Sequence, residues 1–180
     1  MAMSACNHDT ESALHAAARS GDLRHVRALL ARGADPNGAD GIDGATPLQA
    51  AIEGCKAPDE RHALVSLLLD HGADPRRLDA NRSGPLFLAL LYQDTCVLEL
   101  LLRHGADPNA EVGFADKGLL WWARSDYLYE TYGRDLPEEP APATWGDIDA
   151  LIDFLDALAN RHSRPRPEPL RLLRLYGARL

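Results

Sequence analysis

The sequence predicts an all-α protein, organised as a solenoid of stacked helix–turn–helix units. The first observation behind this prediction is a Gly-Ala-Asp-Pro string that occurs three times, with its glycines at Gly33, Gly72 and Gly105. The glycines are 39 and then 33 residues apart, and a leucine-rich segment precedes each of them. A string that returns at such a period indicates one structural unit repeated along the chain.

A second shared string lies upstream of each glycine and begins at Ser12, Thr46 and Gly84. The spacing from its first residue to the following glycine is 21 residues in the first and third units and 26 in the second. We attribute the difference to a five-residue insertion near residues 54–58, between the two helices of the second unit.

In the first unit, apolar residues at helical spacing predict the buried face of the first helix: Leu14, Ala17 and Ala18. Gly21 and Asp22 are expected to end this helix and to cap the next one, since an aspartate side chain accepts bonds from free backbone donors. The second helix then has an apolar stripe of its own: Leu23, Val26, Leu29 and Leu30.

Gly33 is predicted to end the second helix in the left-handed conformation, where a side chain would clash. Pro36 cannot continue a helix, and Asp43-Gly44 is a turn signal before the next unit. A single unit cannot bury its apolar face alone, whereas stacked neighbours can.

The two strings together resemble the ankyrin repeat family, whose pattern is T-P-L-H-x-A-A, a glycine-containing turn, and a leucine-rich helix followed by G-A-D. The resemblance covers residues 11–112, which we interpret as three repeats after an N-terminal tail over residues 1–10. It implies β-hairpin-like fingers between units, and a concave surface for partners formed by the fingers and the first helices.

The pattern is weaker after Asn109. Residues 118–123 align with the second string, but the next Gly-Ala pair, Gly177-Ala178, comes 59 residues later. Either residues 169–176 form the second helix of a fourth repeat that contains an insertion, or residues 146–155 form that helix and the last turn belongs to a truncated fifth unit. We favour the first alternative and interpret residues 113–180 as a divergent fourth repeat with a helical insertion, because residues 172–178 reproduce the helix ending.

This C-terminal region is aromatic and acidic. Residues 114–154 hold eight of the chain's 11 aromatic residues, and residues 111–160 contain 11 acidic residues against three basic ones. One helix is expected there, with an apolar face and an acidic face on its opposite side formed by Asp149, Asp153 and Asp156. The segment is either an insertion that caps the stack or a binding surface for a basic protein partner.

No catalytic signature is present: the sequence has no G-x-S-x-G, no H-E-x-x-H and no phosphate-binding glycine loop. We therefore expect no enzyme, no cofactor and no metal site. The histidine at the family's usual position, His15, is expected to be structural. The three cysteines, Cys6, Cys55 and Cys96, lack metal-ligand spacing and are expected to be buried free thiols in a reducing cytoplasm.

The composition limits the partners further. No run of apolar residues is long enough to cross a membrane, and the first ten residues do not resemble a secretory signal. The net charge of −8 disfavours nucleic acid. We expect a cytoplasmic protein that is monomeric when unbound.

The resulting hypothesis is a non-enzymatic protein-interaction module that binds its partner through the concave surface and the C-terminal insertion. The resemblance implies contact positions on the first helices, at Arg19, Glu53, Leu88, Leu91, Tyr92, Trp122 and Asp126. Finger positions add Arg76, Arg77, Asp79 and Phe114, and the acidic helix adds Asp149, Asp153 and Asp156. Two alternatives stay open: a bacterial immunity or antitoxin protein that neutralises a toxin by binding, and an enzyme with its active site in residues 113–168.

Overall fold

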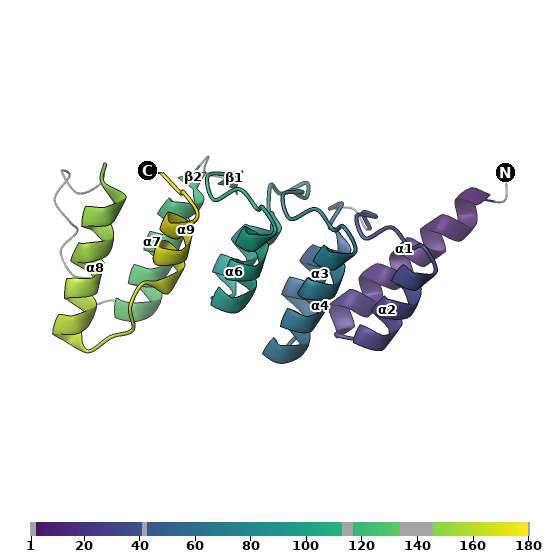
Figure 1. Cartoon of the computed structure of the whole chain (residues 1–180), viewed down its shortest axis with the longest axis horizontal. Coiled ribbons are helices and arrows are strands. Elements are labelled where there is room, and N and C mark those ends of the chain that lie inside the picture. The colour runs from purple at the N-terminus through teal and green to yellow at the C-terminus, as the bar shows by residue number, and fades with distance from the viewer. Residues whose placement is uncertain (1–2, 41–42, 113–116, 134–145, 180) are drawn as a thin grey trace. The chain divides into compact units, whose positions relative to one another are not determined.

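The computed structural model describes the backbone of residues 3–40, 43–112, 117–133 and 146–179, apart from the side chains of residues 3–9, 111 and 117. These residues form nine helices and two short strands (Figure 1). The chain divides into two compact units, Met1–Ala106 and Asp107–Leu180. The predicted all-α class is confirmed.

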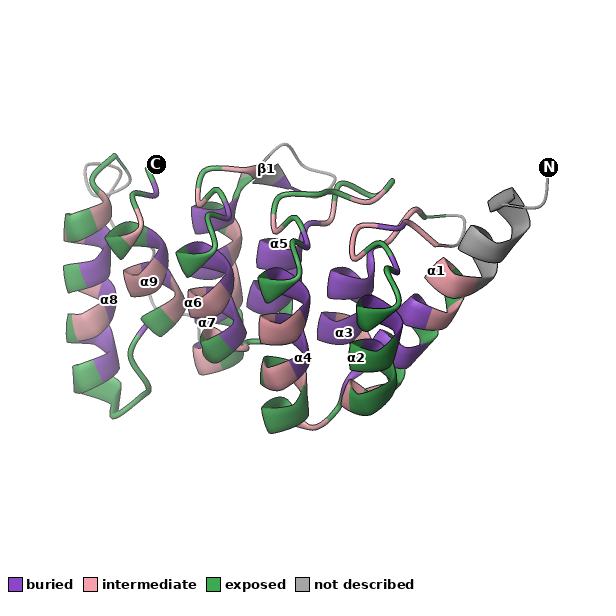
Figure 2. Ribbon diagram, turned by 45° about the vertical axis from the view of Figure 1, so that its right-hand side comes forward, coloured by how far each residue is buried: buried purple, intermediate pink, exposed green. Residues whose placement is uncertain are grey.

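Unit 1 consists of three helix pairs: α1 (Met3–Ser20) and α2 (Leu23–Ala31), α3 (Pro47–Gly54) and α4 (Pro58–Asp70), α5 (Pro85–Leu91) and α6 (Thr95–Arg103). The first helices pack in one row, α1 on α3 and α3 on α5. The second helices pack in another, α2 on α4 and α4 on α6. Figure 2 shows the consequence for α4, whose buried side faces the stack while its other side is exposed.

The helix starts follow the predicted capping chemistry. The Asp22 carboxylate accepts a hydrogen bond of 3.0 Å from the backbone N–H of His25 at the start of α2, and Asp94 does the same for Val97 at the start of α6. Helix α3 begins with a reciprocal capping box between Thr46 and Gln49. Each cap satisfies backbone donors that have no partner inside the helix.

The predicted helix-ending glycines all have a positive φ angle. The angle is 88° at Gly33 and Gly72, 85° at Gly105 and 90° at Gly177. L-residues with a Cβ rarely adopt this conformation, so glycine is the residue that lets the chain turn out of each second helix.

The five extra residues of the second repeat mostly lengthen a helix. Helix α4 has 13 residues, whereas α2 and α6 have nine each. The connection between α3 and α4 is only one residue longer than that between α1 and α2. The insertion is therefore mainly one additional turn of α4, which starts at Pro58.

The N-terminal tail is a difference from the sequence prediction. Helix α1 begins at Met3, so residues 3–10 belong to a helix of 18 residues instead of a tail. Ser12, where the shared string begins, lies inside this helix instead of at its start.

The fingers of unit 1 are held by backbone hydrogen bonds. Asp40 N–H donates to Ala45 O at 3.0 Å, and Asp79 N–H donates to Ser83 O at 3.1 Å. Ala80 N–H donates to Asp43 O at 2.8 Å and so joins one finger to the next.

One side-chain contact recurs between successive turns in unit 1. Asn37 Nδ2 donates to Gly72 O at 2.9 Å, and Asn37 Oδ1 accepts from the backbone N–H of Asp74 at 2.7 Å. Arg76, which stands where the first repeat has Asn37, donates from Nε to Gly105 O at 2.8 Å. Each contact fixes one helix-ending turn to the following one.

Unit 2 consists of β1 (Glu111–Val112), β2 (Lys117–Gly118), α7 (Leu119–Tyr132), α8 (Ile148–His162) and α9 (Glu168–Leu175). The two strands form an antiparallel pair. Helix α9 packs on α7, and α8 packs on α9. The apolar face predicted for α8 is buried at four residues: Leu151, Ile152, Leu155 and Leu158.

The side-chain contact of unit 1 is found again in unit 2. Asn109 Nδ2 donates to Gly177 O at 3.2 Å, and Asn109 Oδ1 accepts from the N–H of Arg179 at 2.8 Å. Both atoms of the asparagine amide are used as they are at Asn37. The turn at Gly177 thus has the same relation to Asn109 as the turn at Gly72 has to Asn37.

Candidate protein-binding surface

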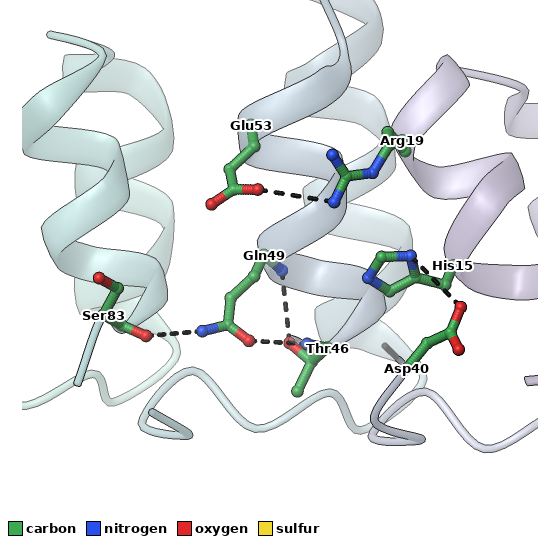
Figure 3. A network of polar contacts seen from close by, with 7 residues as sticks. All are labelled: His15, Arg19, Asp40, Thr46, Gln49, Glu53 and Ser83. Atoms are coloured by element: carbon green, nitrogen blue, oxygen red, sulfur yellow. Dashed lines mark hydrogen bonds and ion pairs between the residues drawn. The ribbon is translucent and has the colours of Figure 1, made fainter. Parts of the chain in front are cut away.

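Matching positions on the first helices of unit 1 lie side by side. Arg19 of α1 and Glu53 of α3 are both the eighth residue of the shared string, and Arg19 Nη2 lies 3.7 Å from Glu53 Oε2 (Figure 3). Leu91 of α5 is the eighth residue in the third repeat, and α5 packs on α3. These three residues therefore form one row, which we call the inner row.

Two large side chains are exposed at the end of α5. Leu91 is 54% exposed and Tyr92 is 46% exposed, although most of the helix around them is buried. Leu88 was predicted to be a contact position, but this prediction was wrong, because its side chain is only 4% exposed. The matching residue of α3, Ala50, is also fully buried, which shows that this side of the first helices faces the stack.

Glu53 has an unusual electrostatic environment for a surface carboxylate. Burial is the main influence and raises the pKa of its carboxyl group. Arg19 acts in the opposite direction, while the negative charges of Asp79 and Asp43 raise the pKa further. The ionised form of Glu53 is therefore less stable in the folded chain than in water.

A polar network lies beneath the inner row (Figure 3). Gln49 Nε2 donates to Ser83 O at 2.6 Å and so links the second repeat to the third. His15, the matching residue of the first repeat, is 8% exposed, and its Nδ1 lies 3.9 Å from Asp40 Oδ2. Burial, followed by the charge of Arg19, lowers the pKa of His15 against the opposing effect of Asp40. His15 is therefore neutral at pH 7 and acts as a packing residue.

The finger residues differ in how much of each side chain is used internally. Arg76 is exposed but donates to Gly105 O, and the Asp79 carboxylate accepts from the N–H groups of Asn81 and Ser83, both at 2.8 Å. Arg77 is exposed as well. Phe114 lies outside the described residues.

In unit 2, the first-helix positions are only partly accessible. Trp122 and Asp126 of α7 are half-buried, and Trp122 meets Trp121 edge to face with ring centroids 5.1 Å apart. Trp121 is 36% exposed, and Tyr129, eight residues further along the same helix, is 68% exposed. Neither residue is among the predicted contact positions, although a spacing of eight residues places both on one helix face.

Other aromatic residues of this segment belong to the packing of unit 2. Tyr127 is buried and its hydroxyl donates to Pro165 O at 2.8 Å; burial raises its pKa. The Tyr132 ring packs edge to face against Tyr127 and against His162 of α8. These contacts attach α8 and the segment after it to α7.

The acidic face of α8 is largely paired with arginines of α9. Asp149 receives two hydrogen bonds from Arg174, at 2.8 and 2.9 Å, and these bonds lower the pKa of Asp149. Asp156 pairs with Arg171. Asp153 lies between the two pairs and is exposed. Two of the three aspartates on this face are therefore paired within unit 2.

Within the described residues, no group of three or more His, Cys, Asp or Glu side chains could hold a metal ion. Cys55 is buried as expected, whereas Cys96 is exposed on α6, where that prediction was wrong. The Cys6 side chain lies outside the described part of the chain. In the described regions, no helix has the length and apolar character needed to cross a membrane.

The helix pairs, the glycine-ended second helices and the hairpin fingers define a helical repeat protein of the class that presents surfaces to other proteins. A family model described as ankyrin repeats, in three copies, matches residues 14–112, and the chain belongs to the ankyrin repeat family. Ankyrin repeats are generally protein–protein interaction modules.

Three relatives show how widely this module is used. The chain is 39% identical to the mouse 2-5A-dependent ribonuclease over 81 residues, which are 45% of this chain and 10% of the relative. It is 42% identical to the NF-kappa-B inhibitor cactus of Drosophila melanogaster over 92 residues, 51% of this chain and 17% of the relative. A putative ankyrin repeat protein of Pyrobaculum aerophilum is 38% identical over 87 residues, 48% of this chain and 30% of the relative. The alignments therefore cover less than a third of each relative.

Proposed function

We propose that this chain is a non-enzymatic binding module that captures a partner protein on the inner row and on the neighbouring exposed end of α5. The observation that carries the proposal is the exposure of Leu91 and Tyr92 on a helix that is otherwise mostly buried. Removal of adjacent apolar side chains from water by a partner surface is favourable. Aromatic residues that become buried in an interface are frequent hot spots.

For unit 2 we propose a fourth repeat, in which α7 is the first helix, α9 the second helix, and α8 an insertion between them. The Asn109 contact with Gly177 supports this assignment, since it uses the same atoms as the Asn37 contact with Gly72. Trp122 and Asp126 then occupy the first-helix positions of this repeat, and Asp153 is an exposed acidic residue of α8.

The narrower hypothesis of an immunity or antitoxin protein remains a proposal of the same class. Two observations support this hypothesis. The first, membership of the ankyrin family, is not specific to immunity proteins. The second is the acidic face of α8, where two of the three aspartates pair with Arg171 and Arg174. A cytoplasmic location, a monomeric unbound state and the absence of nucleic-acid binding are part of the same proposal, in keeping with the net charge of −8.

Site-specific photo-crosslinking in the native cells tests the proposal. A photoreactive benzoyl-phenylalanine is placed at Tyr92, and the matched control carries it at Glu99, on the second helix α6. We expect a discrete cross-linked protein from the Tyr92 position and none from the Glu99 position. Equal cross-linking at both positions would mean that the inner surface of unit 1 has no special role.

A further inference from the structure

The inner row of unit 1 changes character from one repeat to the next. Its three positions hold a cation, an anion and an apolar side chain in order: Arg19, Glu53 and Leu91. Tyr92 extends the apolar end of the row and is 46% exposed. In the order of the row, an anionic position is thus followed by an exposed apolar pair.

The ion pair that Glu53 makes with Arg19 is loose. The closest nitrogen–oxygen distance is 3.7 Å, and the two side chains are 53% and 30% exposed, respectively. Half-exposed pairs of this kind contribute little to stability, so exchange of Arg19 for another cation carries a small penalty. The Arg61–Asp94 pair between α4 and α6 differs, because its distance is 2.7 Å and its side chains are 13% and 11% exposed.

The finger carboxylates make the surroundings of Glu53 more negative. Asp79 and Asp43 both interact with Glu53 strongly enough to oppose its ionisation, and the whole chain has a net charge of −8. A partner cation at this position is attracted by the three carboxylates and competes with Arg19 for Glu53. An anion at the same position would be repelled.

We propose that the inner row binds a basic-apolar segment of the partner protein, with an arginine or lysine on Glu53 and an adjacent apolar side chain on Leu91 and Tyr92. This inference rests on the proposed function and specifies the chemistry of the partner. Glu53 selects the charge, and the apolar pair supplies buried contact area.

Selection of phage-displayed random dodecapeptides against the full chain tests this inference. We expect the selected peptides to be enriched in an arginine or lysine next to a large apolar residue. Peptide affinity, measured by fluorescence anisotropy, should fall about tenfold in Glu53→Gln and in Leu91→Ala, because each change removes one half of the recognition. The loss in Glu53→Gln should shrink as salt is added, and the loss in Leu91→Ala should not.

Two matched variants serve as controls. Glu99→Gln removes a carboxylate that is 39% exposed and pairs with Arg103 on α6, and Leu175→Ala removes a leucine that is 76% exposed on α9. Neither change should alter peptide affinity. Circular dichroism of all four variants establishes that they are folded.

The outcomes separate the two proposals. Acidic or uncharged peptides that still depend on Leu91 would overturn the basic-apolar partner while keeping the inner surface as the binding site. Peptides whose affinity is unchanged by Glu53→Gln and by Leu91→Ala would overturn the proposed function itself. Self-association of the chain that is abolished by Leu91→Ala would also overturn the inference, since a second copy would then be the occupant of the inner row.

Discussion

Two regions of the molecule use the same contact to enclose different lengths of chain. Asn37 and Gly72 are 35 residues apart, and Asn109 and Gly177 are 68 residues apart, yet each asparagine amide donates to the glycine carbonyl and accepts from the residue two positions later. In unit 1 the enclosed chain contains one helix pair, whereas in unit 2 it also contains α8. The comparison shows that the turn is specified by its own glycine and by the asparagine, independently of the chain length between them.

The two regions also differ in how they hold negative charge. Asp149 of α8 accepts hydrogen bonds from Nε and Nη2 of Arg174 at 2.8 and 2.9 Å, whereas the closest nitrogen–oxygen distance between Arg19 and Glu53 of α3 is 3.7 Å. Two of the aspartates in the most acidic segment of the sequence are therefore paired internally. Glu53, in the repeats, is less tightly paired, and it is the carboxylate that we propose as the contact for a partner cation.

The largest expected effect concerns the role of α8 in unit 2. Leu155 is completely buried, so Leu155→Ala should lower the free energy of unfolding of unit 2 by about 3 kcal/mol through lost packing and a residual cavity. Hydrogen exchange should show faster exchange in α7 and α9 as well as in α8. Asp153→Ala, an exposed change on the same helix, is the control. Unchanged exchange in α7 and α9 would mean that α8 is only attached to the unit and does not support it.

A smaller effect tests whether the two asparagine contacts are equivalent. Asn37→Ala and Asn109→Ala should each lower the free energy of unfolding by about 1 kcal/mol, because each removes two hydrogen bonds at an exposed site. Urea denaturation followed by circular dichroism measures both. If Asn37→Ala destabilises the chain and Asn109→Ala does not, the two contacts are not equivalent, since the same geometry would not contribute the same free energy.

The next prediction concerns pH and the buried polar side of unit 1. The pKa of His15 is lowered below its ordinary value of 6.5 in the folded chain, so the unfolded chain binds the proton more readily. The stability that neutral His15 contributes is present above that value and is lost as the pH falls below it. Thermal unfolding of His15→Gln should depend less on pH below this value than that of the wild type, with glutamine as the residue that already stands at the matching position of α3.

The control for this prediction is His62→Gln, which changes an exposed histidine on α4. It should leave the pH dependence of unfolding as it is in the wild type. A wild-type slope that is retained in His15→Gln would assign the pH dependence to other groups.

The smallest expected effects contrast Glu53 and Asp149 directly. Folding raises the pKa of Glu53, so Glu53→Gln should leave the stability of unit 1 unchanged or slightly increased at neutral pH. Folding lowers the pKa of Asp149, so Asp149→Asn should destabilise unit 2 slightly, and added salt should remove the difference. Urea denaturation at low and high salt compares them. If Glu53→Gln instead destabilised the protein more than Asp149→Asn, the charge of Glu53 would be the one that stabilises the fold.

The repeat geometry was predictable because it depends on local chemistry. The positive φ angles at Gly72 and Gly177 and the cap at Asp22 follow from what each residue type allows in its own turn. The buried face of α8 followed from apolar spacing alone. Each of these features is encoded within a few residues of where it occurs.

The candidate surface was less predictable because it depends on tertiary contacts. The sequence could not show that Arg171 and Arg174 would neutralise Asp156 and Asp149, since nothing local brings α9 to α8. The prediction that Leu88 contacts a partner was wrong for a related reason. The repeat pattern gives its position along the helix but not which side of the helix faces the stack.

The Asn109–Gly177 contact has an evolutionary consequence. It fixes the chain before α7 and after α9, so the segment between these helices starts and ends at defined places. The entropy of closing such a loop grows only with the logarithm of its length, so each doubling costs about 0.6 kcal/mol. A lineage could therefore extend, replace or splice a new element between α7 and α9 while keeping its ancestral framework, which makes this segment a natural place for the protein to diversify.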